Sequence, residues 1–507
     1  MHCPAGGGCG AMSEEAKEYK GIFKSTFLFS FVQVVRLLAG VIRNKVAAVL
    51  LGPSGMGIIG VYNSTITFIK IGAGLGVSQS AVRDVSEAKG CGDRYRFSRT
   101  ISLTNRIVWF TAFLGLVCTV VLSPMLSQWG FGNKAYTLAF VILSLAVAAD
   151  IFVDNQLAIL KGMRQLRSLA KASIIGSIAS LVTGVPLFYF FGEKGIVPSI
   201  IFSAIAAMCV SMFYVRKISY DKISMSVRDI FRDGKSMLTM GVSLMLVSFI
   251  AMAFNYIIIT FIRSNGGLDT IGIYTAGSTI ITSYFGIVIN AMTTDYYPRI
   301  SAINKDDVKL QEAMNQQSEV GLMLVFPLAI LFLFLSRLVL SILYTDDFFG
   351  AVEYTDFAML GTVITICSGN MTMILLAKQK PKIFLTSVIC QRVFMLVVFL
   401  VSFSFWGLRG LGIAYFLQGV VDLIVAIVIM KKFYNICFSK KVLYNLMMIL
   451  VSCSLAIWIR RMDGMIVYVF GTLLLLWSIY YSNQYLKKSM NINLLEFVRA
   501  KMKHNNK

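Results

Sequence analysis

The chain has little charge, proline or histidine. Charged residues make up 14% of its 507 positions, and it holds eight prolines and two histidines, His2 and His504. Soluble domains carry roughly 25% charged residues, so this composition excludes an ordinary soluble domain and a disordered chain. Histidine this scarce gives no reason to expect a zinc site, and eight prolines exclude a proline-rich scaffold.

Recognisable sites for chemistry are scarce as well. The nine cysteines are scattered without regular spacing, so no disulfide framework is expected. Gly234-Lys235-Ser236 lacks the upstream glycine of a nucleotide-binding loop. The connections between apolar runs are short, which leaves no room for a soluble catalytic domain. We therefore expect no cofactor and no enzyme; a polymerase or ligase acting on a lipid would need catalytic residues in larger outer loops.

Long apolar runs dominate instead, with 57% hydrophobic residues. A membrane-spanning helix needs ~20 mostly apolar residues. The first run is too long for a cleaved signal peptide, although Met12 is an alternative start. We predict an all-α polytopic membrane protein with about 14 transmembrane helices. They are expected at 26–51, 55–82, 100–125, 134–160, 170–191, 196–215, 236–262, 271–297, 318–344, 352–377, 383–406, 411–430, 442–459 and 465–485.

Positive charge alternates from one connection to the next. The net charge is +22, and 34 of the 47 lysines and arginines fall in the termini and every second loop. The opposite loops hold six: Lys134, Lys194, Arg263, Arg409, Arg460 and Arg461. Because cytoplasmic loops retain positive charge, both termini are predicted to be cytoplasmic. The basic face suits anionic membrane lipids, and no nucleic-acid partner is needed to explain it.

The chain also carries a weak internal repeat. Ile-Gly-Val-Tyr at 59–62 returns as Ile-Gly-Ile-Tyr at 271–274, six predicted helices further on. Two six-helix halves in one orientation form a parallel repeat, which in transporters encloses a site near the midplane. The predicted organisation is an N-terminal segment (1–22), an N-lobe (23–215), a linker (216–235), a C-lobe (236–431), two further helices (442–485) and a cytoplasmic tail (486–507).

Four cations lie far from the ends of their predicted helices: Arg36, Arg43, Lys70 and Arg392. A charged residue at a helix centre costs about 2.5–3.5 kcal/mol on insertion scales. Left unpaired, the four would cost on the order of 10 kcal/mol. They must therefore meet water, carboxylates or an anionic ligand.

Three acids lie within the predicted helices. Asp150 and Asp154 are one turn apart, and Asp422 follows Gln418 by one turn. One interpretation pairs Arg36 or Lys70 with Asp150 or Asp154, and Arg392 with Asp422, as structural ion pairs. The other places the cations in a cavity that holds a phosphate-bearing ligand, with the carboxylates as counter-ions or ion-coupling groups. Both can hold in part.

Four stretches resemble the Wzx-type flippases of the multidrug/oligosaccharidyl-lipid/polysaccharide exporter superfamily. They are 44–62 (NKVAAVLLGPSGMGIIGVY), 155–170 (NQLAILKGMRQLRSLA), 295–301 (DYYPRIS) and 377–381 (AKQKP). The resemblance implies twelve to fourteen helices in two lobes around a cationic cavity, and undecaprenyl-pyrophosphate carrying a sugar repeat unit as cargo. Arg36 or Arg43 would match the family's arginine in the first helix.

The resulting hypothesis is a flippase of the bacterial inner membrane. It would move the lipid-linked oligosaccharide from the cytoplasmic to the periplasmic leaflet by alternating access, for O-antigen or related polysaccharide synthesis. Its partners would be that lipid, membrane lipids, and a polymerase and chain-length regulator of the same pathway. The alternatives are a lipid II flippase, which differs in cargo, and a cation-coupled drug antiporter, which would need an acidic cavity.

Overall fold

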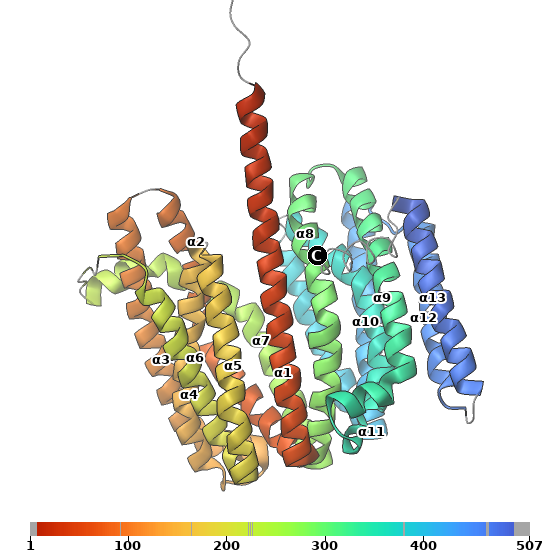
Figure 1. Cartoon of the computed structure of the whole chain (residues 1–507), viewed down its shortest axis with the longest axis horizontal. Helices are drawn as coiled ribbons and strands as arrows, with labels where there is room; N and C mark the ends of the chain where they lie inside the picture. The colour runs from red at the N-terminus through yellow and green to blue at the C-terminus, as the bar shows by residue number, and fades with distance from the viewer. Residues whose placement is uncertain are drawn as a thin grey trace, which may run out of the picture. The chain divides into compact units, whose positions relative to one another are not determined.

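The computed structural model describes residues 8–91, 93–163, 165–221, 223, 225, 227–378, 381–462 and 466–490, and the side chains from Val32 onward with further gaps. Within these ranges every regular element is a helix (Figure 1). The predicted all-α polytopic fold is therefore confirmed.

The helices group into two packed units. The first runs to Gly55 and then from Val61 to Thr260. The second contains Met56–Gly60 and the chain from Phe261 onward. Residues 236–260, which we predicted to open the second lobe, pack in the first unit; the predicted division into transport lobes stays a prediction.

The described residues of the first unit form seven α-helices; α7 continues into the second unit, and Met56–Gly60 of α1 belongs to the second unit as well. Within the first unit α3 packs against α4, α5 against α6, and α4 against α6. These neighbouring helices are seen together in Figure 1. The bounds are α1 (Gly8–Ala73), α2 (Val77–Gly90), α3 (Arg94–Phe131), α4 (Thr137–Gly162), α5 (Leu166–Phe191), the 3₁₀ turn η1 (Gly192–Gly195), α6 (Ile196–Arg216) and α7 (Val227–Thr279).

The second unit packs α10 against α11, and α9 against α10, α12 and α13. A buried core forms where α8, α9, α10 and α11 meet, around Tyr296, Met314, Met371 and Met430. The bounds are the π-helical turn η2 (Ile280–Phe285), α8 (Gly286–Ala302), α9 (Asp307–Leu343), the 3₁₀ turn η3 (Asp346–Phe348), α10 (Ala351–Ala377), α11 (Pro381–Tyr434), α12 (Lys440–Ile459) and α13 (Ile466–Met490).

Nine helical segments of the described chain are long and apolar enough to cross a membrane. Four of them, each 38 residues or longer, contain a glycine of positive φ: Gly52, Gly192, Gly267 or Gly407. Each break divides its segment in two. With α13 as a further helix, the described residues hold fourteen helical stretches near the predicted positions.

Two of these breaks have nearly the same backbone geometry. Gly192 has φ 55° and ψ −132°, and Gly407 has φ 55° and ψ −135°. This region is essentially confined to glycine. Shortly afterwards the chain passes close to the preceding helix: a Cβ on Gly195 would lie 2.1 Å from the Leu187 carbonyl oxygen, and one on Gly410 would lie 1.9 Å from that of Ser402. The turns Gly192–Gly195 and 407–410 are therefore one structure that occurs twice, once in each unit.

The helix predicted at 55–82 ends earlier than expected. Helix α1 stops at Ala73, because Leu75 and Gly76 take φ of 47° and 63°. Helix α2 then begins at Val77 and is short and amphipathic. The predicted span missed this break because the run stays apolar through it, and only its glycines mark the change of direction.

Candidate functional site

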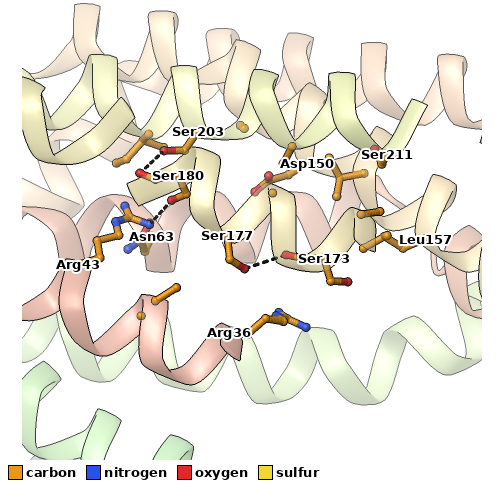
Figure 2. A pocket seen from close by; sticks show the side chains of 18 of the residues that line it. Arg36, Arg43, Asn63, Asp150, Leu157, Ser173, Ser177, Ser180, Ser203 and Ser211 are labelled. Carbon is orange, nitrogen blue, oxygen red and sulfur yellow. Dashed lines mark hydrogen bonds between the residues drawn. The ribbon is translucent and has the colours of Figure 1, made fainter. Parts of the chain in front are cut away.

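Two predicted cations meet at one cavity of the first unit. Arg36 and Arg43 lie two turns apart on α1, and the small residues Ala39 and Gly40 between them leave space beside the helix. The cavity has a volume of about 440 Å³ and is also lined by α4, α5 and α6. Figure 2 shows α1 on one side of it and serine-bearing helices on the other.

The two guanidinium groups have different surroundings. Arg43 is half-buried, and its Nη1 donates to Ser180 Oγ at 3.2 Å. Arg36 is exposed at the cavity, and no carboxylate of the described residues lies within 4.0 Å of it. A single neutral hydroxyl cannot neutralise a cation, so the positive charge of both side chains remains available to an anion.

Serines of α5 and α6 supply most of the polar side chains on the opposite wall, and sequence reasoning missed them. Ser173, Ser177 and Ser180 recur at intervals of four and three positions, which places them on one helical face. Ser203 from α6 donates to the Ser180 carbonyl at 3.5 Å. The spacing was visible in the sequence, but serine costs little in a membrane helix and does not stand out as charge does.

Asp150 on α4 lines the same cavity and is half-buried. Of the pairings considered for it, neither Arg36 nor Lys70 comes within 4.0 Å among the described residues. The cavity therefore holds two cations and one carboxylate, with hydroxyls between them.

Lys70 forms the ion pair that one interpretation predicted. Its Nζ lies 3.1 Å from Asp154 Oδ2, and the two side chains are 24% and 46% exposed. Both line a smaller cavity of about 90 Å³, next to buried Asn155. Asn155 donates to Asn105 Oδ1 at 3.4 Å. Lys70 is thus neutralised by α4, one turn beyond Asp150.

Arg392 and Asp422 lie in α11 in the second unit, and the predicted ion pair between them is not formed. Asp422 Oδ1 instead accepts from Gln418 Nε2, one turn earlier on the same helix. Arg392 Nη1 points to Met395 Sδ at 3.5 Å. One hydrogen bond from a neutral amide does not neutralise a carboxylate, so Asp422 and Arg392 each keep their charge without forming an ion pair with one another.

The repeated glycine turn relates this second cluster to the first cavity. The offset that carries Gly192 onto Gly407 also carries Ser177 onto Arg392 and Ser203 onto Gln418. It further carries Ala207, another cavity residue, onto Asp422. The two units therefore carry polar groups at corresponding positions, with the cations on different helices.

Comparison with known proteins identifies the family. Residues 46–353 match the model of a family described as polysaccharide biosynthesis protein. The chain belongs to this family. The match covers more than half of the sequence and includes the Gly52 turn, α4 and the first helices of the second unit.

Two relatives in this group have functional names. The chain is 25% identical over 307 residues to a Shigella flexneri protein provisionally named O-antigen transporter, covering 59% of this chain and 71% of that one. It is 22% identical over 281 residues to the lipid III flippase of Escherichia coli (strain K12), covering 54% and 65%. The relatives that are named by function are thus transporters rather than enzymes, and the Wzx-type resemblance is confirmed.

Solved structures support the fold. The lipid II flippase MurJ superposes with a TM-score of 0.70 at 13% identity, over 93% of this chain and all of that one. A multidrug transporter of the MATE family gives 0.59 at 16% identity, over 83% and 95%. These likenesses show the fold. The family match and the nine apolar helical segments of the described chain make the protein a multi-pass membrane protein.

Proposed function

We propose that the protein moves an undecaprenyl-pyrophosphate-linked oligosaccharide repeat unit from the cytoplasmic to the periplasmic leaflet of the bacterial inner membrane. The observation that carries this proposal is the cavity between α1 and the serine-bearing helices, with Arg36 and Arg43 on one wall. Arginine suits phosphate because its planar donors match two phosphate oxygens at once. Serine hydroxyls can donate to, and accept from, sugar hydroxyls.

Each predicted site residue has a role in this proposal. Arg36, Arg43 and Arg392 bind the pyrophosphate, and Lys70 contributes when its pair with Asp154 opens. Asp150, Asp154 and Asp422 serve as counter-ions or as carriers of a coupling ion. The lobes alternate between inward and outward openings, both termini are cytoplasmic, and a polymerase and chain-length regulator use the product.

The membrane potential can drive this transfer. A pyrophosphate diester carries about two negative charges, and an inside-negative potential pushes anions outward. Moving two such charges out across a potential of about 100 mV gains roughly 4.6 kcal/mol. No nucleotide hydrolysis is required for a transfer with this driving force.

The test is transfer of a labelled lipid in liposomes, with and without an inside-negative potential. Losing one charge-assisted hydrogen bond costs about 1.5–3 kcal/mol, so Arg36→Gln and Arg43→Gln should each lower transfer by about ten- to a hundredfold. Lys161→Gln, which removes an exposed cation at the end of α4 outside the cavity, should leave it unchanged. Equal transfer by all variants would refute the role of the cavity.

The same assay distinguishes between the candidate lipid cargoes. Undecaprenyl-pyrophosphate oligosaccharide and lipid II are offered separately to the wild-type protein. We expect the oligosaccharide lipid to be transferred faster. A preference for lipid II, or proton-driven export of an organic cation with no lipid transfer, would select one of the two alternative functions.

A further inference from the structure

A second charged cavity lies in the other unit, at the end of α9 and α12. Its volume is about 460 Å³. Four arginines line it: Arg337 from α9, Arg409 from the turn in α11, and Arg460 and Arg461 after α12. Two acids of α10, Glu353 and Asp356, line it as well. The lining thus carries an excess of two positive charges.

One of these arginines is largely buried and already paired with a carboxylate. Arg460 Nη2 donates to Asp356 Oδ2, and the two side chains are only 12% and 3% exposed. Its Nη1 donates to Ser336 Oγ and to the Leu333 carbonyl. Because Arg460 is held by α9 and α10 and neutralised by Asp356, it positions the neighbouring Arg461 without needing a ligand itself.

The other three guanidinium groups are not neutralised in this way. Arg337, Arg409 and Arg461 are exposed, and no carboxylate of the described residues lies within 4.0 Å of them. Arg409 lies over the ring of Phe357, 5.5 Å from its centroid, which holds the guanidinium at the cavity. Asp346 and Asp347 belong to η3 and do not line the cavity.

These arginines lie on the side of the membrane where the sequence places few positive charges. The loops predicted to be extracytoplasmic hold only six lysines and arginines, and Arg409, Arg460 and Arg461 are three of them. Arg337 lies toward the same end of α9. Retention of positive charge explains cytoplasmic loops, but it gives no reason to gather arginines from three helices on the opposite side.

We propose that this cavity binds the phosphate group of a ligand at the outer surface of the membrane, through Arg337, Arg409 and Arg461. Three guanidinium groups around one opening match the several oxygens of a phosphate. The cavity lies at helix ends, where a membrane protein meets lipid head groups. Two sources share this chemistry: the phosphodiester of an anionic phospholipid, and a soluble pyrophosphate. This binding does not depend on the proposed transport function.

The experiment measures binding by the full-length protein in non-ionic detergent, using native mass spectrometry and thermal unfolding. The probes are phosphatidylglycerol, phosphatidylcholine and inorganic pyrophosphate, with sodium chloride at matched ionic strength. We expect phosphatidylglycerol or pyrophosphate to bind and raise the unfolding temperature, and phosphatidylcholine to do neither. Phosphatidylglycerol alone identifies a lipid site, and pyrophosphate alone identifies a soluble anion site.

The variant Arg409→Gln/Arg461→Gln should weaken this binding at least tenfold while unfolding at the temperature of the wild-type protein without ligand. Lys134→Gln/Lys194→Gln is the matched control, because both lysines are exposed and Lys194 occupies the turn in the first unit that corresponds to the Arg409 turn. Equal binding by wild type and the arginine variant, or no preference over phosphatidylcholine and chloride, would overturn the proposal. Lipid transfer by the same variant, measured separately, keeps this outcome distinct from a failure of the proposed function.

Discussion

At the scale of single residues, the cost of burying charge predicted which charged residues line cavities, but it predicted their ion pairs less well. It singled out Arg36 and Arg43, which share one cavity, and Lys70, which pairs with Asp154. It did not find the pair of Arg460 with Asp356, because Arg460 follows a helix in sequence and reads as a loop residue. Only the packing of α12 against α9 and α10 brings that arginine into the interior.

Among the ion pairs described in the second unit, Asp356–Arg460 should be the costliest to break. Removing one partner of a buried pair leaves an uncompensated charge and costs about 3–5 kcal/mol. Asp356→Ala should lower the free energy of unfolding in detergent by that amount. The double variant Asp356→Leu/Arg460→Met should recover a substantial part, since both charges are gone. A loss below about 1 kcal/mol for Asp356→Ala, the level of an exposed pair, would contradict this account.

At the scale of helices, apolar runs predicted nearly every segment, but the places where the chain turns depended on glycine. The Ile-Gly-Val-Tyr match pairs position 59 with position 271, whereas the turns pair Gly192 with Gly407, and the two registers differ by less than one helical turn. A four-letter match within an apolar helix is easily shifted by a turn. Backbone angles that only glycine adopts readily fix the alignment to a single residue. They align Ser177 with Arg392, which the sequence comparison alone did not do.

Alanine substitutions at Gly410 and Gly369 test whether the close turn in α11 requires glycine. A Cβ at position 410 would lie 1.9 Å from the Ser402 carbonyl oxygen, while one at position 369, inside α10, would meet nothing within 4 Å. Gly410→Ala should therefore force the two halves of α11 apart and lower the unfolding temperature. Gly369→Ala should raise stability by about 0.5–1 kcal/mol, because alanine is the better helix former. Equal unfolding temperatures for the two variants would show that the close turn is not needed.

At the scale of the whole molecule, the alternation of charge predicts which side of the membrane each loop faces. The helices alone do not determine this orientation. Fourteen helical stretches are compatible with either direction, so the assignment of cytoplasmic termini rests on 34 of the 47 lysines and arginines lying on one side. The two packed units could not be foreseen to the residue, because Met56–Gly60 joins the second unit through close packing of Gly57 on Leu268.

Cysteine labelling measures the orientation. Cys91 is a free, exposed thiol in the turn between α2 and α3, on the side predicted to be cytoplasmic. In chains with a single cysteine, a membrane-impermeant maleimide applied to intact spheroplasts should label Lys134→Cys and spare Cys91. Permeabilised cells should show labelling of both. Labelling of Cys91 alone in intact spheroplasts would show that the chain is oriented opposite to the prediction.

The ion pair between Lys70 and Asp154 also bears on how the protein is made. Lys70 leaves the ribosome well before Asp154, because α2, α3 and most of α4 lie between them in the sequence. At ~5–20 residues per second, synthesis of that stretch takes on the order of ten seconds. During that time α1 carries Arg36, Arg43 and Lys70 while α4 and α5, which complete their surroundings, are still unsynthesised. Helix α1 therefore cannot rely on its final neighbours to offset the cost of these three charges while it enters the bilayer.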